Sequence, residues 1–371
     1  MKKNLRSKIL LCVLAGGVLA ANTALANSIG TVIVDGEPKT IDVSKDYSIG
    51  SNYAENVQIT SDSDYSLYID SATKGTINGQ QLTVNGQTFF TRSGVELAIG
   101  TKGVTNTVSI NSSNQFVVFS GYSAKVNINA ENININSYAD FAAPAVWGEG
   151  GGFISLNGEN INLKSKEYGL VAFSGSELNV NGNLTVNADR AIGTRGDSTI
   201  DINTDGKNTT VLNGDIVFET LYTGSGNVIN SNININLSGE ESSWTGRAYQ
   251  EYKVDNGSGK YEYTHSVELD APDDYGDVTG FKMNINNGAS WNMTDDSFIN
   301  NVTVENGGVI NVQEKVKEFN VGSRAADDKG GITLNNGVIN LQGENQQITA
   351  TELDGTGGTV NTNSLNNWYC C

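Results

Sequence analysis

Residues that could support catalysis are few in this chain. Its only histidine, His265, would have to serve in any Ser-His-Asp triad. No serine lies in a Gly-x-Ser-x-Gly element, and Gly196-Asp197-Ser198 is followed by Thr199. Because a triad needs all of its members, the sequence argues against a protease.

Acidic residues gather in one loop, which is the strongest candidate for binding a metal. Its aspartates are Asp270, Asp273, Asp274 and Asp277. Calcium prefers carboxylate oxygens, but this spacing matches no EF-hand and the Gly-Gly-x-Gly-x-Asp repeat is absent. Aspartate is stable in loops without a metal, so a solvated acidic turn is the favoured interpretation and no cofactor is predicted.

One tripeptide and one segment suit contact with a partner. Arg195-Gly196-Asp197 is the integrin-recognition sequence, although Lys102-Gly103 fills what looks like the matching turn of an earlier repeat, so the turn alone also explains it. The segment is a tyrosine-rich hairpin, in which Tyr249, Tyr252, Tyr261 and Tyr263 alternate with charges. Tyrosine offers a large contact area at low entropic cost, so these rings suit either a glycan or protein ligand, or packing across the strands.

The composition separates this chain from proteins that bind nucleic acid. Of 371 residues, 41 are acidic and 23 are basic, which gives a net charge of −18 at pH 7. Such a charge opposes binding to nucleic acid or to anionic lipid and keeps a repetitive protein soluble. The 43 glycines, 3 prolines and only 17% charged residues suit a surface of strands and turns.

The N-terminus has the regions of a secretory signal peptide. Basic residues precede an apolar run at 9–21, and Ala24-Leu25-Ala26 is a cleavage site of the A-x-A type. We expect cleavage between Ala26 and Asn27, which removes residues 1–26. The apolar run is too short to cross about 30 Å of hydrocarbon. The protein is therefore predicted to be exported, without a membrane-spanning segment.

Short alternating strands, separated by small polar residues, fill the rest of the chain. Segments 125–135, 153–163 and 177–186 share one strand-turn-strand plan, and the leucine-rich pattern is missing. The inward positions are expected to stack at a spacing of roughly 18 to 28 residues, the length of one coil of short strands: Ile110, Ile128, Leu156, Val180 and Ile202. An antiparallel sandwich fits the recurring turns less well. The sequence predicts an all-β protein, a right-handed parallel β-helix (solenoid) with stacked aliphatic residues, asparagine ladders and a hairpin projecting from residues 247–267.

Motifs in the second half resemble a known family. Ser243-Trp244-Thr245-Gly246, Ala289-Ser290-Trp291 with the residues after it, and segment 353–361 are similar to the pertactin-like passenger domains of Gram-negative autotransporters. The resemblance covers residues 239–363 best. It implies a surface adhesin that is secreted through its own C-terminal outer-membrane barrel, with a protein or glycan of a host or neighbouring cell as partner. Trp244 and Trp291 are expected to pack in the core.

The end of the chain departs from this family. Residues 364–371 differ in composition from the body, and no room is left for a barrel of at least eight strands of roughly ten residues. We expect a solenoid at 27–363, a hairpin insertion at 239–277 and an atypical tail at 364–371, in a truncated or frame-shifted product. Its location would be the cell surface or outer membrane if the full gene encodes a barrel, and otherwise the periplasm or the medium. A non-functional remnant is a further hypothesis.

Two functions remain after these exclusions. The favoured one is a non-enzymatic adhesin. The alternative is a carbohydrate-active β-helix enzyme, a polysaccharide lyase or hydrolase, which needs calcium-binding aspartates with an arginine, or paired carboxylates. A cluster of acids and arginine on one face of stacked strands would distinguish the two. The sequence shows none, but distant coils could build one.

Overall fold

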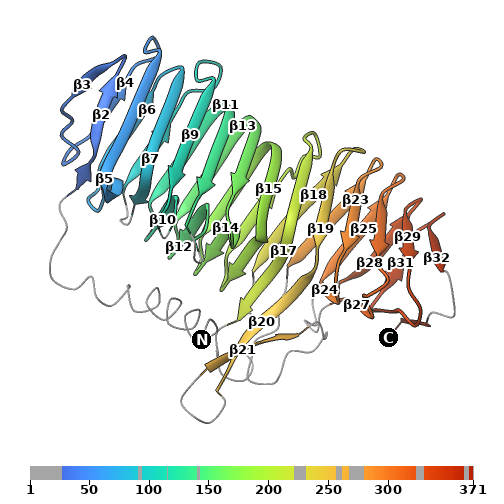
Figure 1. Ribbon diagram of the computed structural model, residues 1–371. Helices are drawn as coiled ribbons and strands as arrows, with labels where there is room; N and C mark the ends of the chain where they lie inside the picture. The colour runs from blue at the N-terminus through green and yellow to red at the C-terminus, as the bar shows by residue number, and fades with distance from the viewer. Residues whose placement is uncertain are drawn as a thin grey trace.

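The chain folds into an elongated solenoid whose strands stack in sequence order along one axis (Figure 1). All regular elements in the described part of this computed structural model are β-strands. No described helix is long and apolar enough to cross a membrane. The all-β class and the parallel solenoid predicted from the sequence are confirmed. The described residues are 27–90, 94–114, 116–139, 143–220, 231–255, 261–266, 280–322, 330–362 and 367–370.

Each coil contributes strand segments to three faces, and long strands bend from one face into the next. The first face is a continuous parallel ladder. Its members are β4 (Tyr47–Gly50), β6 (Lys74–Asn78), β8 (Glu96–Ile99), the first parts of β11 (Lys125–Ser137), β13 (Phe153–Lys164) and β15 (Glu177–Arg195), then β16 (Thr199–Ile202), β18 (Asn232–Ser238), β22 (Phe281–Asn286), β25 (Asn301–Glu305), β28 (Gly331–Asn335) and β31 (Leu353–Asp354).

The second face continues these strands around the next corner of the coil. It contains β5 (Asn56–Ile69), β7 (Gln81–Phe90), β9 (Thr107–Ser112), the later parts of β11, β13 and β15, then β17 (Thr210–Thr220), β19 (Ser243–Gly246), β23 (Ser290–Met293), β26 (Val309–Val312), β29 (Val338–Leu341) and β32 (Thr359–Thr362).

The third face is made in two runs. The first run holds the ends of β5, β7, β15 and β17 with β10 (Val118–Gly121), β12 (Val146–Glu149), β14 (Tyr168–Phe173) and β20 (Ala248–Asp255). The second holds β24 (Ser297–Ile299), β27 (Glu318–Val321), β30 (Gln347–Ala350) and β33 (Asn367–Cys370). Strand β33, within the segment expected to be an atypical tail, thus pairs in parallel with β30.

Among the strands that the structure describes, antiparallel pairing occurs at two places. At the N-terminal end, β2 (Thr31–Val34) pairs with β3 (Glu37–Lys39) and with β5, and β1 (Ser28–Ile29) also pairs with β5. The second place is the hairpin of β20 with β21 (Tyr261–Ser266), which projects from the solenoid in Figure 1. A projecting hairpin was predicted here, but the excursion is narrower than 239–277, because β19 is an ordinary strand of the second face.

The core is a stack of inward aliphatic side chains, as expected for a parallel coil. Ile128, Leu156, Val180 and Ile202 lie in one buried column of the first face. Ile110 was assigned to the same column, and this was wrong: it pairs with Ile135, on the second face. Strands on both faces carry the same alternation of aliphatic residue and asparagine, so the local pattern does not specify the face.

Trp244 and Trp291 occupy equivalent positions of neighbouring coils and are fully buried. Their rings stack with centroids 4.3 Å apart and an interplanar angle of 13°. Each Nε1 donates a hydrogen bond to a backbone carbonyl, at Gly214 (2.8 Å) and Gly246 (3.1 Å). The buried indole N–H groups are therefore satisfied, and the predicted core packing is confirmed.

Asparagine ladders line the outside of the first and second faces. On the first face, Asn157 Nδ2 donates to Asn129 Oδ1 (3.1 Å), and Asn181 Nδ2 donates to Asn157 Oδ1 (2.9 Å). A longer ladder on the second face joins Asn292, Asn311, Asn340 and Asn361. The predicted ladders are present, on the strands themselves rather than only at turns.

Candidate functional site

The outer side of the third face carries side chains unlike those of the other faces. Parallel pairing aligns Glu149 with Phe173, Phe173 with Arg195, and Glu219 with Glu251. Thr194 and Phe218, the residues that precede Arg195 and Glu219, are also paired, so Arg195 lies next to Glu219. Together these pairs form one line, here called the outer row: Glu149, Phe173, Arg195, Glu219 and Glu251. Strands β12, β14, β15, β17 and β20 supply one member each. The sequence separates these residues by whole coils, and the stacking brings them together.

Arg190 and Tyr168 hold two carboxylates of the outer row. Arg190 pairs in two places with Glu251, Nη1 to Oε2 at 3.0 Å and Nη2 to Oε1 at 3.1 Å. Its Nη1 also lies 3.9 Å from Glu219 Oε1 and donates to the Tyr168 hydroxyl. That hydroxyl donates in turn to Glu219 Oε1. One guanidinium thus bridges carboxylates on adjacent strands, and a tyrosine completes the chain of hydrogen bonds.

The burial of this network governs its electrostatics. Burial, followed by the charge of Glu219, raises the pKa of Tyr168 well above its usual value, so the phenol stays a hydrogen-bond donor. Burial also raises the pKa of Glu251, although Arg190 opposes that shift. For Arg190, burial alone would lower the pKa, but Tyr168 and Glu251 outweigh it and raise the pKa. The arginine therefore remains a fixed positive charge between the two acids.

Next to these charged residues, the outer side of the third face carries a group of aromatic rings. Phe116, Phe119 and Trp147 pack edge-on or tilted, with centroids 5.3 to 6.0 Å apart. Phe173 contacts Trp147 with centroids 6.1 Å apart, and the Arg195 guanidinium carbon lies 4.1 Å from the centre of the Phe173 ring. These aromatic residues form a cluster separate from the aliphatic core of the coils. The third face is therefore apolar on both of its sides near β10, β12 and β14.

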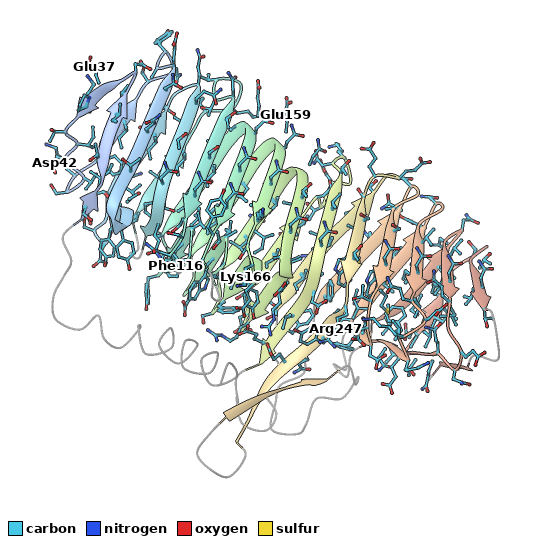
Figure 2. All side chains as sticks on the ribbon, viewed as in Figure 1. Glu37, Asp42, Phe116, Glu159, Lys166 and Arg247 are labelled. Atoms are coloured by element: carbon cyan, nitrogen blue, oxygen red, sulfur yellow. The ribbon has the colours of Figure 1, made fainter. Side chains whose placement is uncertain are left out.

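A further ion pair lies beside this network. Arg247 Nε is 3.3 Å from Asp215 Oδ2, and its guanidinium carbon lies 4.2 Å from the centre of the Tyr249 ring. In Figure 2, Phe116, Lys166 and Arg247 lie along one side of the solenoid, and Glu159 lies at the opposite edge. The structure therefore brings acids and arginines from distant coils to one face.

The integrin-type tripeptide is built into a stack of tight turns. Gly196 and Asp197 have φ values of 57° and 45°, and Ser174 and Gly175 of the neighbouring coil have 56° and 78°. The peptide N–H groups of Ser174 and Gly175 donate to the carbonyls of Arg195 and Gly196. Arg195 is only 5% exposed, so its guanidinium is not presented to a receptor in this conformation. This geometry argues against the tripeptide as a surface ligand.

The proposed match between this turn and Lys102-Gly103 is wrong. Ala191 and Ile192 precede Arg195 on the third face, where Ile192 pairs with Leu170. Ala98 and Ile99, from the similar earlier sequence, lie on the first face. Residues 98–103 (Ala-Ile-Gly-Thr-Lys-Gly) and 191–196 (Ala-Ile-Gly-Thr-Arg-Gly) differ at one position in sequence but begin on different faces of the coil.

Of the other predicted site residues, some have side chains that the structure describes and the rest do not. Tyr249 is buried, at 3% exposed, so it is not an open contact residue in this conformation. Tyr252, Tyr261 and Tyr263 lie on the hairpin strands β20 and β21, but their side chains lie outside the described part of the structure. Asp270 to Asp277 and Ala26 lie outside the described residues, and Asn27 is the first described residue. Among the described residues, no group of three His, Cys, Asp or Glu side chains could hold a metal.

Sequence reasoning missed the network of Tyr168, Arg190, Glu219 and Glu251. One signal could have shown it: the segment Tyr168–Phe173 is apolar without alternation, and all its residues are buried. A continuous apolar run predicts a strand covered on both sides. Charged residues next to such runs are the ones to expect in a buried network.

Comparisons with protein-family models, with curated proteins and with solved structures find no match for this chain. The similarity to autotransporter passengers therefore depends on the quoted motifs and on the compatible solenoid fold.

Proposed function

We propose that this chain is the exported passenger of a Gram-negative autotransporter and acts as a non-enzymatic surface adhesin. The observation that carries this proposal is the hairpin of β20 and β21, which projects from an otherwise regular parallel solenoid. A solenoid is a rigid, extended support, and a projecting hairpin on it is a natural place for a ligand. The stacked Trp244 and Trp291 lie in the coils that carry the family resemblance.

The outer part of the hairpin can be removed while the paired residues at its base, Glu251 and His265, are kept. Residues 252–264 would be replaced by Asn-Gly, which closes a two-residue hairpin between Glu251 and His265, residues that pair in the structure. This keeps the contact of Glu251 with Arg190. We expect the variant to lose most of its binding to epithelial or bacterial cells, measured with the fluorescently labelled purified protein.

A matched control changes an exposed turn elsewhere. Asp205→Ala with Lys207→Ala removes an exposed ion pair between β16 and β17 and should leave cell binding intact. Equal binding by the hairpin variant and the parent would disprove the adhesive role of the hairpin. For export, N-terminal sequencing after expression in a Gram-negative host should find Asn27 first, and protease treatment of intact cells tests surface exposure.

The network of acids and arginine favours a second candidate, a carbohydrate-active enzyme. Glu219 and Glu251 pair on adjacent strands, which lie about 4.8 Å apart in parallel sheets. Carboxyl groups about 5 Å apart suit a retaining glycosidase. Against this role, Tyr168 and Arg190 already occupy both carboxylates. Reducing-sugar release from a panel of polysaccharides that is lost in both Glu219→Gln and Glu251→Gln would establish the enzyme, and no release by the parent protein would exclude it for that panel.

A further inference from the structure

The outward side of the second face carries almost no charge. From β7 to β32, parallel pairing aligns two columns of outward side chains, with one member of each column on every strand. The first, here called the amide column, runs from Asn85 to Asn361 and is asparagine on every strand except at Lys164 and Thr245. The second runs from Thr83 to Thr359 and holds only threonine, serine, asparagine and valine. Lys164 is the one charged member of these two described columns, and every member of both is accessible to solvent.

The amides of this column keep hydrogen-bonding groups for a partner. An asparagine side chain has two N–H donors and an oxygen with two lone pairs. Along the column one bond joins neighbours, from Asn311 Nδ2 to Asn292 Oδ1 and from Asn340 Nδ2 to Asn311 Oδ1, both at 2.9 Å. In the contacts described, Asn311 therefore uses one donor and one lone pair, and it keeps the second of each. These remaining groups repeat at the spacing of the strands, about 4.8 Å.

Other surfaces of the protein are less suited to contact with a second copy. The net charge of −18 makes two copies repel one another. The outward side of the first face carries exposed charges at Lys74, Lys125 and Glu177. The projecting hairpin extends the third face, so it does not belong to the second. The second face is therefore the long surface on which two copies can approach without burying acids against each other.

We propose that the second face is a self-association surface, on which the amide columns of two copies of this chain pack against each other. An amide is donor and acceptor at once, so a column of amides is complementary to its own copy, as a twofold interface requires. Two copies also share one strand spacing, so several hydrogen bonds can form in register. A saccharide or an unrelated protein has no such built-in match to this repeat. The proposal does not depend on the adhesin role, since it concerns a different face and the purified protein tests it.

Symmetry determines how the two copies lie. A twofold axis parallel to the strands sets the solenoid axes antiparallel and places one amide column on the other. With full overlap this axis passes at β17, the middle strand of the eleven, so Asn213 faces its own copy. Strands about 4.8 Å apart make a face about 50 Å long, and a width of about 13 Å gives about 650 Å² per copy. A total of about 1,300 Å² lies at the low end of standard interfaces, so the association is weak and reversible.

Sedimentation velocity of the purified protein tests this surface, at concentrations up to about 0.2 mM, where weak complexes form. We expect a reversible dimer whose dissociation constant falls at least about threefold between about 50 mM and about 500 mM NaCl, because salt screens the repulsion between two acidic copies. Asn213→Glu and Asn213→Lys should each weaken association at least about tenfold, since each sets a charge against its own copy at the axis. An equimolar mixture of these two variants should associate again, because opposite charges then meet.

Two control variants separate the surface from the added charge. Asn213→Thr keeps the column neutral, as Thr245 does on the next strand, and should leave association within about twofold of the parent. Asn127→Glu adds the same charge to the outward side of the first face and should associate as the parent does. Far-ultraviolet circular dichroism checks folding, and Thr245→Glu, which breaks no described ladder bond, keeps the test decisive if the Asn213 variants misfold.

Three results would overturn the proposal. These are a monomer at every concentration, association that salt weakens, and equal association of folded Asn213→Glu and Asn127→Glu. A mixture of Asn213→Glu and Asn213→Lys that stays monomeric would overturn the antiparallel arrangement. Self-association that survives removal of the hairpin, together with lost cell binding, supports both this surface and the separate adhesive role of the hairpin.

Discussion

The first and third faces of the solenoid use the same stacked backbone but opposite kinds of outward side chain. On the first face, exposed charges such as Lys125 flank a column of neutral, largely solvent-accessible amides that repeats from coil to coil, at Asn129, Asn157 and Asn181. On the third face, the outer row holds four charged side chains and one aromatic ring, all buried except the half-buried Glu149. An amide is both donor and acceptor, so one residue type satisfies itself along the whole axis.

Charges do not have this property. A column of identical buried charges would repel itself, so each acid of the outer row needs a particular cation beside it. Arg190 fills that role for Glu219 and Glu251. The ladder is therefore a generic device of the fold, whereas the network depends on individual residues.

The largest expected effect that tests this difference comes from Arg190→Met. The substitution leaves Glu219 and Glu251 as buried neighbours without their shared cation, which should cost about 3–5 kcal/mol. The free energy of local opening would be measured by amide hydrogen exchange in β14, β15 and β17, because a solenoid need not unfold in one step. Lys125→Met on the first face should change stability by less than about 0.5 kcal/mol. Equal, small effects of the two variants would show that the network contributes no more than a surface charge.

A smaller effect is expected within the amide ladder. Asn157→Ala removes the two ladder hydrogen bonds, to Asn129 and from Asn181, together with a bond to Ser155 within its own strand. The two ladder bonds should cost about 1–2 kcal/mol, near 1 kcal/mol for each. Asn179→Ala is the matched control, because Asn179 bonds only within its own strand, to Glu177, in the contacts described. Amide hydrogen exchange of β13, which carries Asn157, and of β15, which carries Asn179, measures the two effects. If the two variants lose the same stability, the ladder is a packing pattern and not a source of stability.

The same contrast explains how far the sequence could predict this structure. The solenoid, the ladders and the buried Trp244 and Trp291 follow from repeated local patterns, which stacking converts directly into columns. The column of Ile110 could not be assigned, because an Ile-Asn strand looks the same on every face. The contact of Arg190 with Glu251 joins residues on coils far apart in sequence, and no local pattern specifies that pairing. Tyr249 and Arg195 are buried because they lie on the third face, and neither the tyrosine-rich hairpin sequence nor the Arg-Gly-Asp tripeptide indicates that burial.

The smallest expected effect is the pH dependence of stability that comes from Glu149, at the edge of the outer row. Burial raises the folded-state pKa of Glu149 above its unfolded value, so the folded protein binds this proton more tightly than the unfolded chain. Stability from this group is therefore present at low pH and is lost as the pH rises through the folded-state pKa. Glu149→Gln has a permanently neutral side chain, so it should be more stable than the parent protein at pH 7.5, and the difference should shrink towards pH 5.

Chemical denaturation at several pH values measures that difference, with Glu159→Gln as the control. Glu159 is exposed at the opposite edge of the solenoid, so its substitution should produce a difference that is small and nearly constant with pH. A parent protein that is more stable than Glu149→Gln at pH 7.5 would mean that the ionised carboxylate is stabilised by Arg195 more than burial penalises it. Glu149 would then compensate the charge of Arg195 without a net cost, and the contrast between the amides of the first face and the costly buried charges of the third face would fail at this point.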